Sequence, residues 1–406
     1  MSQAPPLTPT FTYAELFPAG SVLAPKTGLA QMRWVDFSEF RVDYATGAPL
    51  PVLGEMTLIC HRNMLTPAIR AFYQSAGIRL RGTHRVYSTH AEAMQLARDC
   101  QMQGSRLAYL YSLPDEIVNG DRLVVAARLY DWINDKANIN LLCESRHLPE
   151  HVLLAPDERA AIADVLPQRA IFVKLCHPGV SGGGTDVRFC PDQASRQSAL
   201  AWLAARPSGW SAIRVEEAVE VRESWCLNLA VSENGDVRYL GAAAQLFSSP
   251  AMQSGSRIDP QNQPAAATIA LATEIARKAA ALDFVGVAGF GMGETRDGKA
   301  LVFDLNFRLA ACTPQILLHE SATHRIGGKI SQTWGRQLPG PLAPALAALE
   351  QFARSGQFVP MRFYESTEAP GDASRMNGML VARTQGEIDE LQAAVDAAVD
   401  AATGGR

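Results

Sequence analysis

The chain has 406 residues, too many for one compact core, so two or three packed units are expected. Hydrophobic residues make up 47% and charged residues 19%, an ordinary balance for a globular protein with a large core. The formal net charge of −4 argues against general affinity for nucleic acid or anionic membranes, because both need clustered Lys and Arg. No stretch approaches the roughly 20 apolar residues of a membrane span.

The N-terminus and the cysteines indicate the compartment. The first residues contain neither the basic nor the apolar segment of a secretory signal. The seven cysteines are scattered and never in CxxC spacing, so we expect buried thiols and neither a disulfide frame nor a zinc site. These features predict a cytoplasmic protein.

The first third of the chain predicts an α/β unit. Residues 1–54 show no sustained hydrophobic period, and we expect an irregular leader there. The runs MTLIC from Met56 and RLAYLYSL at 106–113 are strand-like, and helices are predicted at about 66–76 and 121–134. Alternating strands and helices favour a parallel sheet with helices on its faces.

Strand and turn signals dominate the rest of the chain. Residues 170–176 and 187–190 predict a hairpin with a glycine-rich tip. The segments 212–221 and 225–244 are expected to form antiparallel strands, with ENGD as the turn. We also expect helices near 194–206 and 264–282, strands at 285–292 and 300–308, and a tail of one helix, two strands and a last helix with Ile388, Leu391, Val395 and Val399 on one face.

The hairpin tip is the first segment with chemical content. Consecutive glycines expose backbone N–H groups and permit positive φ, so such a loop can wrap the oxygen atoms of a polyphosphate, and Lys174 on the adjoining strand adds a positive charge. Neither a Walker loop nor a dinucleotide fingerprint fits, because no GK[ST] and no helix follows the glycines. A hairpin tip without function remains the alternative.

A row of polar residues marks the strand at 300–308. Alternate residues of a strand share a face, so Asp304, Asn306 and Arg308 are predicted to point the same way. Carboxylate and amide oxygens suit Mg²⁺, and an arginine beside them can meet phosphate or developing negative charge. A solvated sheet face is the alternative, but the hydrophobic flanks lead us to expect a central, buried strand.

Taken in order, these segments resemble the ATP-grasp superfamily over about residues 130–310. The resemblance implies an α/β protein in which ATP lies between two α+β subdomains. Lys174 would contact the α- and β-phosphates, and Arg308 would steady the acyl phosphate and the tetrahedral intermediate. Asp304 and Asn306 would bind Mg²⁺. The loop that closes over the β/γ end of ATP would be formed by Gly179, Ser181, Gly182, Gly183 and Gly184, and the adenine-binding hinge by Glu216, Glu217, Ala218 and Val219, with Glu223 holding the ribose hydroxyls.

The same resemblance implies the domain organisation. Residues 1–130 would form the leader and a Rossmann-like pre-ATP-grasp domain, and 131–215 the small ATP-grasp subdomain with the glycine loop. Residues 216–335 would form the large subdomain with the metal site. Residues 336–406 would be a small C-terminal α+β extension that acts as a lid or dimer element.

Two features depart from the family pattern. The strand before Asp304 has glycine, Gly289 or Gly291, where the family supplies a second acidic metal ligand. Asp304 is therefore expected to bind the cation in a bidentate manner, with water or substrate completing the shell. Many members also carry an ATP-binding lysine partway along the helix that begins here at Asp135. That lysine is missing, and Lys136 is expected to be a surface residue at the helix start.

The implied activity is phosphoryl transfer from ATP to a small-molecule carboxylate, followed by attack of an amine on the acyl phosphate. Amino-acid ligases are the nearest analogues, and a homodimer is the expected assembly. Two alternatives are a ligase that modifies a peptide or protein terminus and a degenerate ATP-binding module. His319 and His324 are five residues apart, not the four of a HExxH zinc motif, although His319 or Glu320 could approach the acceptor.

Overall fold

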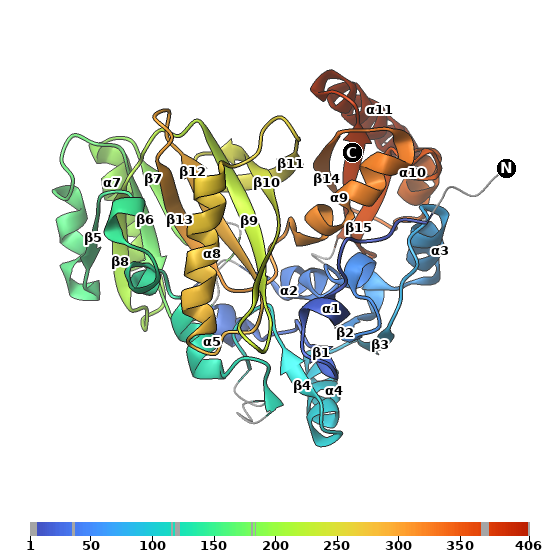
Figure 1. The fold of residues 1–406 in the computed structure, drawn as a ribbon, viewed down its shortest axis with the longest axis horizontal. Coiled ribbons are helices and arrows are strands. Elements are labelled where there is room, and N and C mark those ends of the chain that lie inside the picture. The colour runs from blue at the N-terminus through green and yellow to red at the C-terminus, as the bar shows by residue number, and fades with distance from the viewer. Residues whose placement is uncertain are drawn as a thin grey trace.

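Three sheets organise the computed structural model, which describes residues 6–34, 37–114, 117, 122–179, 182, 184–366 and 373–404 (Figure 1). Two of these sheets have four strands and the third has eight. Among the described helices, none combines the length and the apolar composition that a membrane crossing requires.

The N-terminal domain contains the parallel sheet that the sequence predicts. Its strands lie in the order β3-β2-β1-β4, and every pair within it is parallel. Thr66 and Thr89 cap the helices α3 and α4 by accepting backbone N–H groups of their first turns. The elements are α1 (Tyr13–Leu16), β1 (Ser21–Leu23), α2 (Glu39–Ala45), β2 (Thr57–His61), α3 (Pro67–Ser75), β3 (Thr83–Tyr87), α4 (His90–Met102) and β4 (Arg106–Ala108).

The expectation of an irregular leader at 1–54 is wrong. The three-residue strand β1 lies inside the sheet, between β2 and β4, and α2 follows it. Three residues are too few to show a hydrophobic period, which explains why the sequence pattern misses this strand.

The small antiparallel sheet lies at the left of Figure 1 and has the order β5-β8-β6-β7. The predicted hairpin is present as β6 and β7, with Ile171 opposite Cys190. The segment at 212–217 pairs with β5 and β6, so its expected pairing with 225–244 is wrong. The elements are α5 (Ala127–Asn134), α6 (Ile139–Leu142), β5 (His151–Leu154), β6 (Ile171–Cys176), β7 (Val187–Cys190), α7 (Gln193–Ala204) and β8 (Ala212–Glu217).

The large sheet has the order β13-β12-β9-β10-β11-β14-β16-β15. The ENGD turn joins β9 to β10 as predicted. The C-terminal strands β14–β16 continue this sheet, because β14 pairs with β11. The predicted boundary at 335/336 falls inside β14. The elements are β9 (Glu223–Val231), β10 (Val237–Ser249), β11 (Met252–Ile258), α8 (Ala266–Ala280), β12 (Gly286–Glu294), β13 (Ala300–Asn306), α9 (Thr313–Ile326), β14 (Ile330–Leu338), α10 (Ala343–Ser355), β15 (Phe358–Tyr364), β16 (Ser374–Ala382) and α11 (Gln385–Thr403).

One hydrophobic core joins the C-terminal strands to the N-terminal domain. The Tyr73 hydroxyl on α3 donates to the Met361 carbonyl on β15 at 2.9 Å, and Phe72 packs edge-on against Phe363. The predicted apolar face of α11, formed by Ile388, Leu391, Val395 and Val399, is buried. The helix α2 also contacts β15, so residues from both ends of the chain lie close together.

Candidate active site

A cleft of about 640 Å³ is lined by residues of the N-terminal domain, the small sheet and the large sheet. This volume lies in the range of small-molecule sites. The residues that the sequence singles out and that line the cleft are Lys174, Gly182, Gly184, Glu216, Glu217, Val219, Asp304, Asn306 and Arg308. The glycine hairpin and the polar strand, more than 100 residues apart in sequence, therefore face one space.

Lys174 connects the small sheet to the large one. Its ammonium group donates to the Phe303 carbonyl on β13 at 2.8 Å and lies 2.5 Å from the Glu216 carboxylate. Glu216 also pairs with Arg214, whose Nη1 donates to the Asn140 side chain at 2.8 Å. Burial alone would raise the pKa of Glu216, but the ion pairs with Lys174 and Arg214 outweigh it and hold that pKa below its usual value. A negative charge therefore fixes the position of the lysine.

Lys136 is a buried cleft residue, and its expected place on the surface is wrong. It lies in the 3₁₀ turn Lys136–Asn138 with 7% of its surface exposed. Its ammonium group is 2.7 Å from the Asp186 carboxylate and 3.9 Å from that of Asp304. Burial by itself would lower the pKa of Lys136. The nearby charges of Asp186 and Asp304 raise it by more, so the net shift is upward and the ammonium group stays charged. The cleft thus holds two fixed ammonium groups.

The side chains of Asp304, Asn306 and Arg308 form a hydrogen-bonded row. Arg308 donates to the Asn306 amide oxygen at 2.9 Å, and Asn306 donates to the Asp304 carboxylate at 2.9 Å. The intervening Leu305 and Phe307 are buried on the other face, and Phe307 packs edge-on against Phe290 at 5.1 Å. The predicted alternation is present. The expectation of a central strand is wrong, because β13 is an edge strand of the large sheet.

Gly291 lies opposite Asp304 in the pairing of β12 with β13, and Gly289 lies opposite Asn306. A Cβ atom added at Gly291 would be 3.5 Å from the Asp304 Cβ, an ordinary contact, so packing does not require glycine there. Among the described residues, no group of three or more His, Cys, Asp or Glu side chains is arranged to hold a metal. Asp304 and Asn306 still fit the pattern of Mg²⁺, which takes one or two protein oxygens together with phosphate and water.

The glycine hairpin approaches the turn between β10 and β11. Gly184 has φ +71°, and a Cβ atom there would lie 2.0 Å from the Ala251 carbonyl oxygen. A side chain at this position would therefore both strain the backbone and collide with the turn. Gly179 does not line the cleft; its N–H donates to the Asp131 carbonyl at 3.1 Å, and it packs on Ser112. Two other predicted residues of this loop, Ser181 and Gly183, lie outside the described residues.

The predicted hinge and ribose positions are only partly in the cleft. The N–H groups of Glu217 and Ala218 donate to the carbonyls of Glu150 and Ala170, at 2.8 and 2.9 Å, and Ala218 does not line the cleft. Glu223 also lies outside the lining, and its carboxylate accepts from the Asn262 side chain. Val219 lines the cleft together with Glu216 and Glu217.

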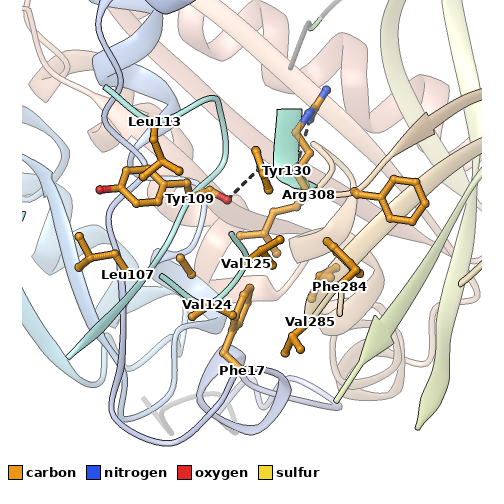
Figure 2. A pocket seen from close by; sticks show the side chains of 14 residues that line it. Phe17, Leu107, Tyr109, Leu113, Val124, Val125, Tyr130, Phe284, Val285 and Arg308 are labelled. Atoms are coloured by element: carbon orange, nitrogen blue, oxygen red, sulfur yellow. Dashed lines mark hydrogen bonds between the residues drawn. The ribbon is translucent and has the colours of Figure 1, made fainter. Parts of the chain in front are cut away.

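A second cavity, shown in Figure 2, is a packing gap with a volume of only about 20 Å³. Its lining is almost entirely apolar and includes Phe17, Val125 and Phe284. The Tyr130 hydroxyl donates to the Tyr109 carbonyl at 3.2 Å beside it. Figure 2 shows the guanidinium of Arg308 pointing away from these apolar side chains. This cavity has room for about one water molecule and is not a substrate site.

The fold matches solved enzymes with bound nucleotide along nearly the whole chain. An ADP complex of N5-carboxyaminoimidazole ribonucleotide synthetase has a TM-score of 0.59 at 11% identity, covering 98% of each chain. The ATP complex of the corresponding synthase from Aspergillus clavatus has a TM-score of 0.54 at 14% identity, covering 94% of this chain and 98% of that one. A nucleotide complex of biotin carboxylase from Campylobacter jejuni has a TM-score of 0.55 at 10% identity, covering 93% and 91%. At these identities the likeness establishes the fold.

Two family models match the sequence, one over each of its first two parts. Residues 12–131 match the N-terminal domain of L-aspartate–L-methionine ligase, and residues 158–306 match the ATP-grasp domain of the same ligase. Fold and models define an ATP-dependent carboxylate–amine ligase of the ATP-grasp superfamily, which confirms the predicted fold class and activity. Together the two models cover more than half of the chain, and each of them covers less than half.

Proposed function

We propose that the protein joins the carboxyl group of an acidic amino acid of the aspartate type to the amine of a second amino acid of the methionine type. The observation that carries this proposal is the gathering of two ammonium groups, one guanidinium and a carboxylate–amide pair on one cleft. Two segments of the chain also match the domain models of L-aspartate–L-methionine ligase. The product would be a dipeptide, released with ADP and phosphate.

The nucleotide would occupy the end of the cleft between the small sheet and β13. Lys174 and Lys136 offer charge to its phosphates, and Gly182 and Gly184 offer close approach of the backbone. Val219 supports an adenine contact, whereas Glu223 is not among the lining residues, so the predicted ribose contact has no support from the cleft lining. Lys136 is added to the predicted residues because its charge is buried and faces the cleft.

Mg²⁺ is the cation that the donor set favours. When bound, it would neutralise phosphate charge and polarise the γ-phosphoryl group. Asp304 and Asn306 would hold it. The Asn306 amide oxygen has two lone pairs, so it could bind the cation while it accepts from Arg308.

The chemistry needs positioning more than acid–base groups. A carboxylate oxygen attacks the γ-phosphorus, the bond to the ADP oxygen breaks, and an acyl phosphate forms. The neutral amine then attacks the acyl carbon, phosphate leaves, and the amine proton passes to water or phosphate. Arg308 would stabilise the oxyanion of the tetrahedral intermediate, and the closed hairpin would exclude water.

ADP release measured with a panel of amino acids tests this function. We expect turnover to require an acidic donor and an amino-acid acceptor together, with a dipeptide detected by mass spectrometry. ATP binding without turnover across the panel would contradict ligation, and turnover only with peptide acceptors would favour modification of a peptide terminus. ATP as substrate and seven buried free cysteines support a cytoplasmic location. The homodimer is also part of the proposal, and sedimentation can test it.

A further inference from the structure

Two arginines of the C-terminal strands share one aromatic ring at the edge of the cleft. The guanidinium of Arg362 on β15 lies 4.0 Å from the Tyr44 ring centroid, and that of Arg375 on β16 lies 4.9 Å from it. Tyr44 belongs to α2 and is 3% exposed. Both arginines, Tyr44 and the nearby Arg41 line the cleft. The ring therefore gathers positive charge at a fixed place on the cleft wall.

These two arginines have no carboxylate partner among the described residues. Neither takes part in an ion pair there, and the Nε of Arg362 is buried without a hydrogen-bond acceptor. The two carboxylates of α2 point to another cation, because Glu39 and Asp43 lie 2.7 and 2.8 Å from Lys26. Burial lowers the pKa of Arg375 most; Tyr44 opposes this effect, and the charges of Arg362 and Arg41 add to it. Like charges held together without an anion are unfavourable, so an anion from outside would relieve the cost.

A row of side chains runs from Arg308 to Arg41, which lines the cleft together with Arg362 and Arg375. Arg308 lies 5.9 Å from the Tyr111 ring, and Tyr111 packs edge-on against Phe37 at 5.9 Å. Arg41 in turn lies 4.6 Å from the Phe37 ring. Arg362 and Arg375 thus line the same cleft as Arg308.

We propose that Arg362 and Arg375 bind the carboxylate of an amino-acid substrate that is not phosphorylated. Paired guanidinium groups bind carboxylates through directed hydrogen bonds and do so best where water is excluded. The inference rests on the proposed function for its substrate class. Two sources share this chemistry: the second carboxylate of the acidic donor, and the carboxylate of the acceptor amino acid.

Steady-state kinetics of the full chain separate the sources. Arg362→Gln and Arg375→Gln are compared with the wild type for L-aspartate, L-methionine and ATP, and Arg383→Gln serves as the control because Arg383 is exposed and directly follows β16. If the two arginines bind the donor, KM for L-aspartate rises at least tenfold in both variants, and L-asparagine is a poor donor for the wild type. If the two arginines bind the acceptor, KM for L-methionine rises in the variants instead, and the wild type and the variants use L-methioninamide equally well. In both cases KM for ATP stays within twofold.

Thermal-shift titration with succinate gives a readout that needs no turnover. We expect succinate to raise the melting temperature of the wild type and of Arg383→Gln, but not that of Arg362→Gln or Arg375→Gln. The Arg375→Lys variant should show part of the wild-type shift. Unchanged KM values for both amino acids in folded variants, together with unchanged succinate shifts, overturn the inference. Failure of the proposed function is distinct from this, because it appears in the wild type as absence of ATP-dependent product. The succinate titration then still decides whether the arginines bind a carboxylate.

Discussion

The ammonium group of Lys174 lies 2.5 Å from the Glu216 carboxylate, and the two side chains are 8% and 2% exposed. The pair gives the lysine two roles, as a charge at the cleft and as the partner of a buried carboxylate. Removing one member of a buried pair leaves the other uncompensated, which typically costs about 3–5 kcal/mol. Variants of Lys174 therefore have to be examined for stability as well as for turnover.

We predict that Lys174→Met lowers kcat/KM for ATP at least about 100-fold, because a fixed charge at the phosphates is lost. We also predict a loss of about 3 kcal/mol in the free energy of unfolding, measured with urea. The double variant Lys174→Met/Glu216→Gln should regain part of that stability without regaining activity. Lys299→Met, at an exposed lysine, is the control. Wild-type kinetics in Lys174→Met would refute its assignment to the nucleotide site.

Asp304 and Asn306 give a prediction about the metal. In Asp304→Asn the shape is kept but the anionic ligand is lost, so the Mg²⁺ concentration for half-maximal activity should rise at least about tenfold. Turnover should fall by orders of magnitude at fixed Mg²⁺. The matched control is Asp297→Asn, at an exposed carboxylate in the turn before β13. An unchanged Mg²⁺ requirement would remove Asp304 from the metal site.

Local patterns in the sequence predicted the parts of the site that lie within one segment. Strand alternation brought Asp304, Asn306 and Arg308 to one face, and consecutive glycines marked the hairpin tip. The hydrophobic flanks of β13 did not reveal that it is an edge strand. Leu305 and Phe307 would look the same in a central strand, since their burial comes from packing on one face of the sheet.

Features that depend on contacts between distant segments could not be predicted in this way. Lys136 pairs with Asp186, fifty residues away in the sequence. The residues next to either one contain no pattern that would predict this ion pair. The arginine cluster joins α2 to strands more than 300 residues later in the chain. A buried charge is recognisable only once its partner and its solvent exposure are known, and a lysine at a helix start is usually a surface residue.

Lys136 yields a prediction that the sequence alone would not support. Lys136→Met removes the cation between Asp186 and Asp304, so these two carboxylates repel each other and the phosphates of ATP. We expect KM for ATP to rise at least about tenfold and the melting temperature to fall by several degrees. In the Lys136→Met/Asp186→Asn variant, stability should partly return. Normal ATP binding by Lys136→Met in isothermal titration would contradict the assignment.

Alanine variants of two glycines with positive φ can distinguish the effect of backbone strain from an effect on activity. Gly184 has φ +71° and faces the Ala251 carbonyl, whereas Gly298 has φ +83° and open space around its Cα. Alanine at either position should cost about 1 kcal/mol of stability through strain. Only Gly184→Ala should impair activity, by about tenfold or more in kcat/KM for ATP, because its methyl group meets the turn that the hairpin approaches. Equal kinetics of the two variants would show that the hairpin does not close there.

His319 gives a prediction for acid stability. Its ring on α9 lies 2.9 Å from the Ser331 hydroxyl, and burial lowers its pKa to about 4. The folded protein therefore favours the neutral ring, and the stability this provides is complete above the unfolded pKa of about 6.5 and is lost as pH falls toward 4. Between pH 6.5 and 4.5 the free energy of unfolding of His319→Gln should fall by about 2 kcal/mol less than that of the wild type. Urea titrations at both pH values measure this difference. His324→Gln, at an exposed position of the same helix, should keep the wild-type fall, and an equally steep fall in His319→Gln would show that this ring is not protonated on unfolding.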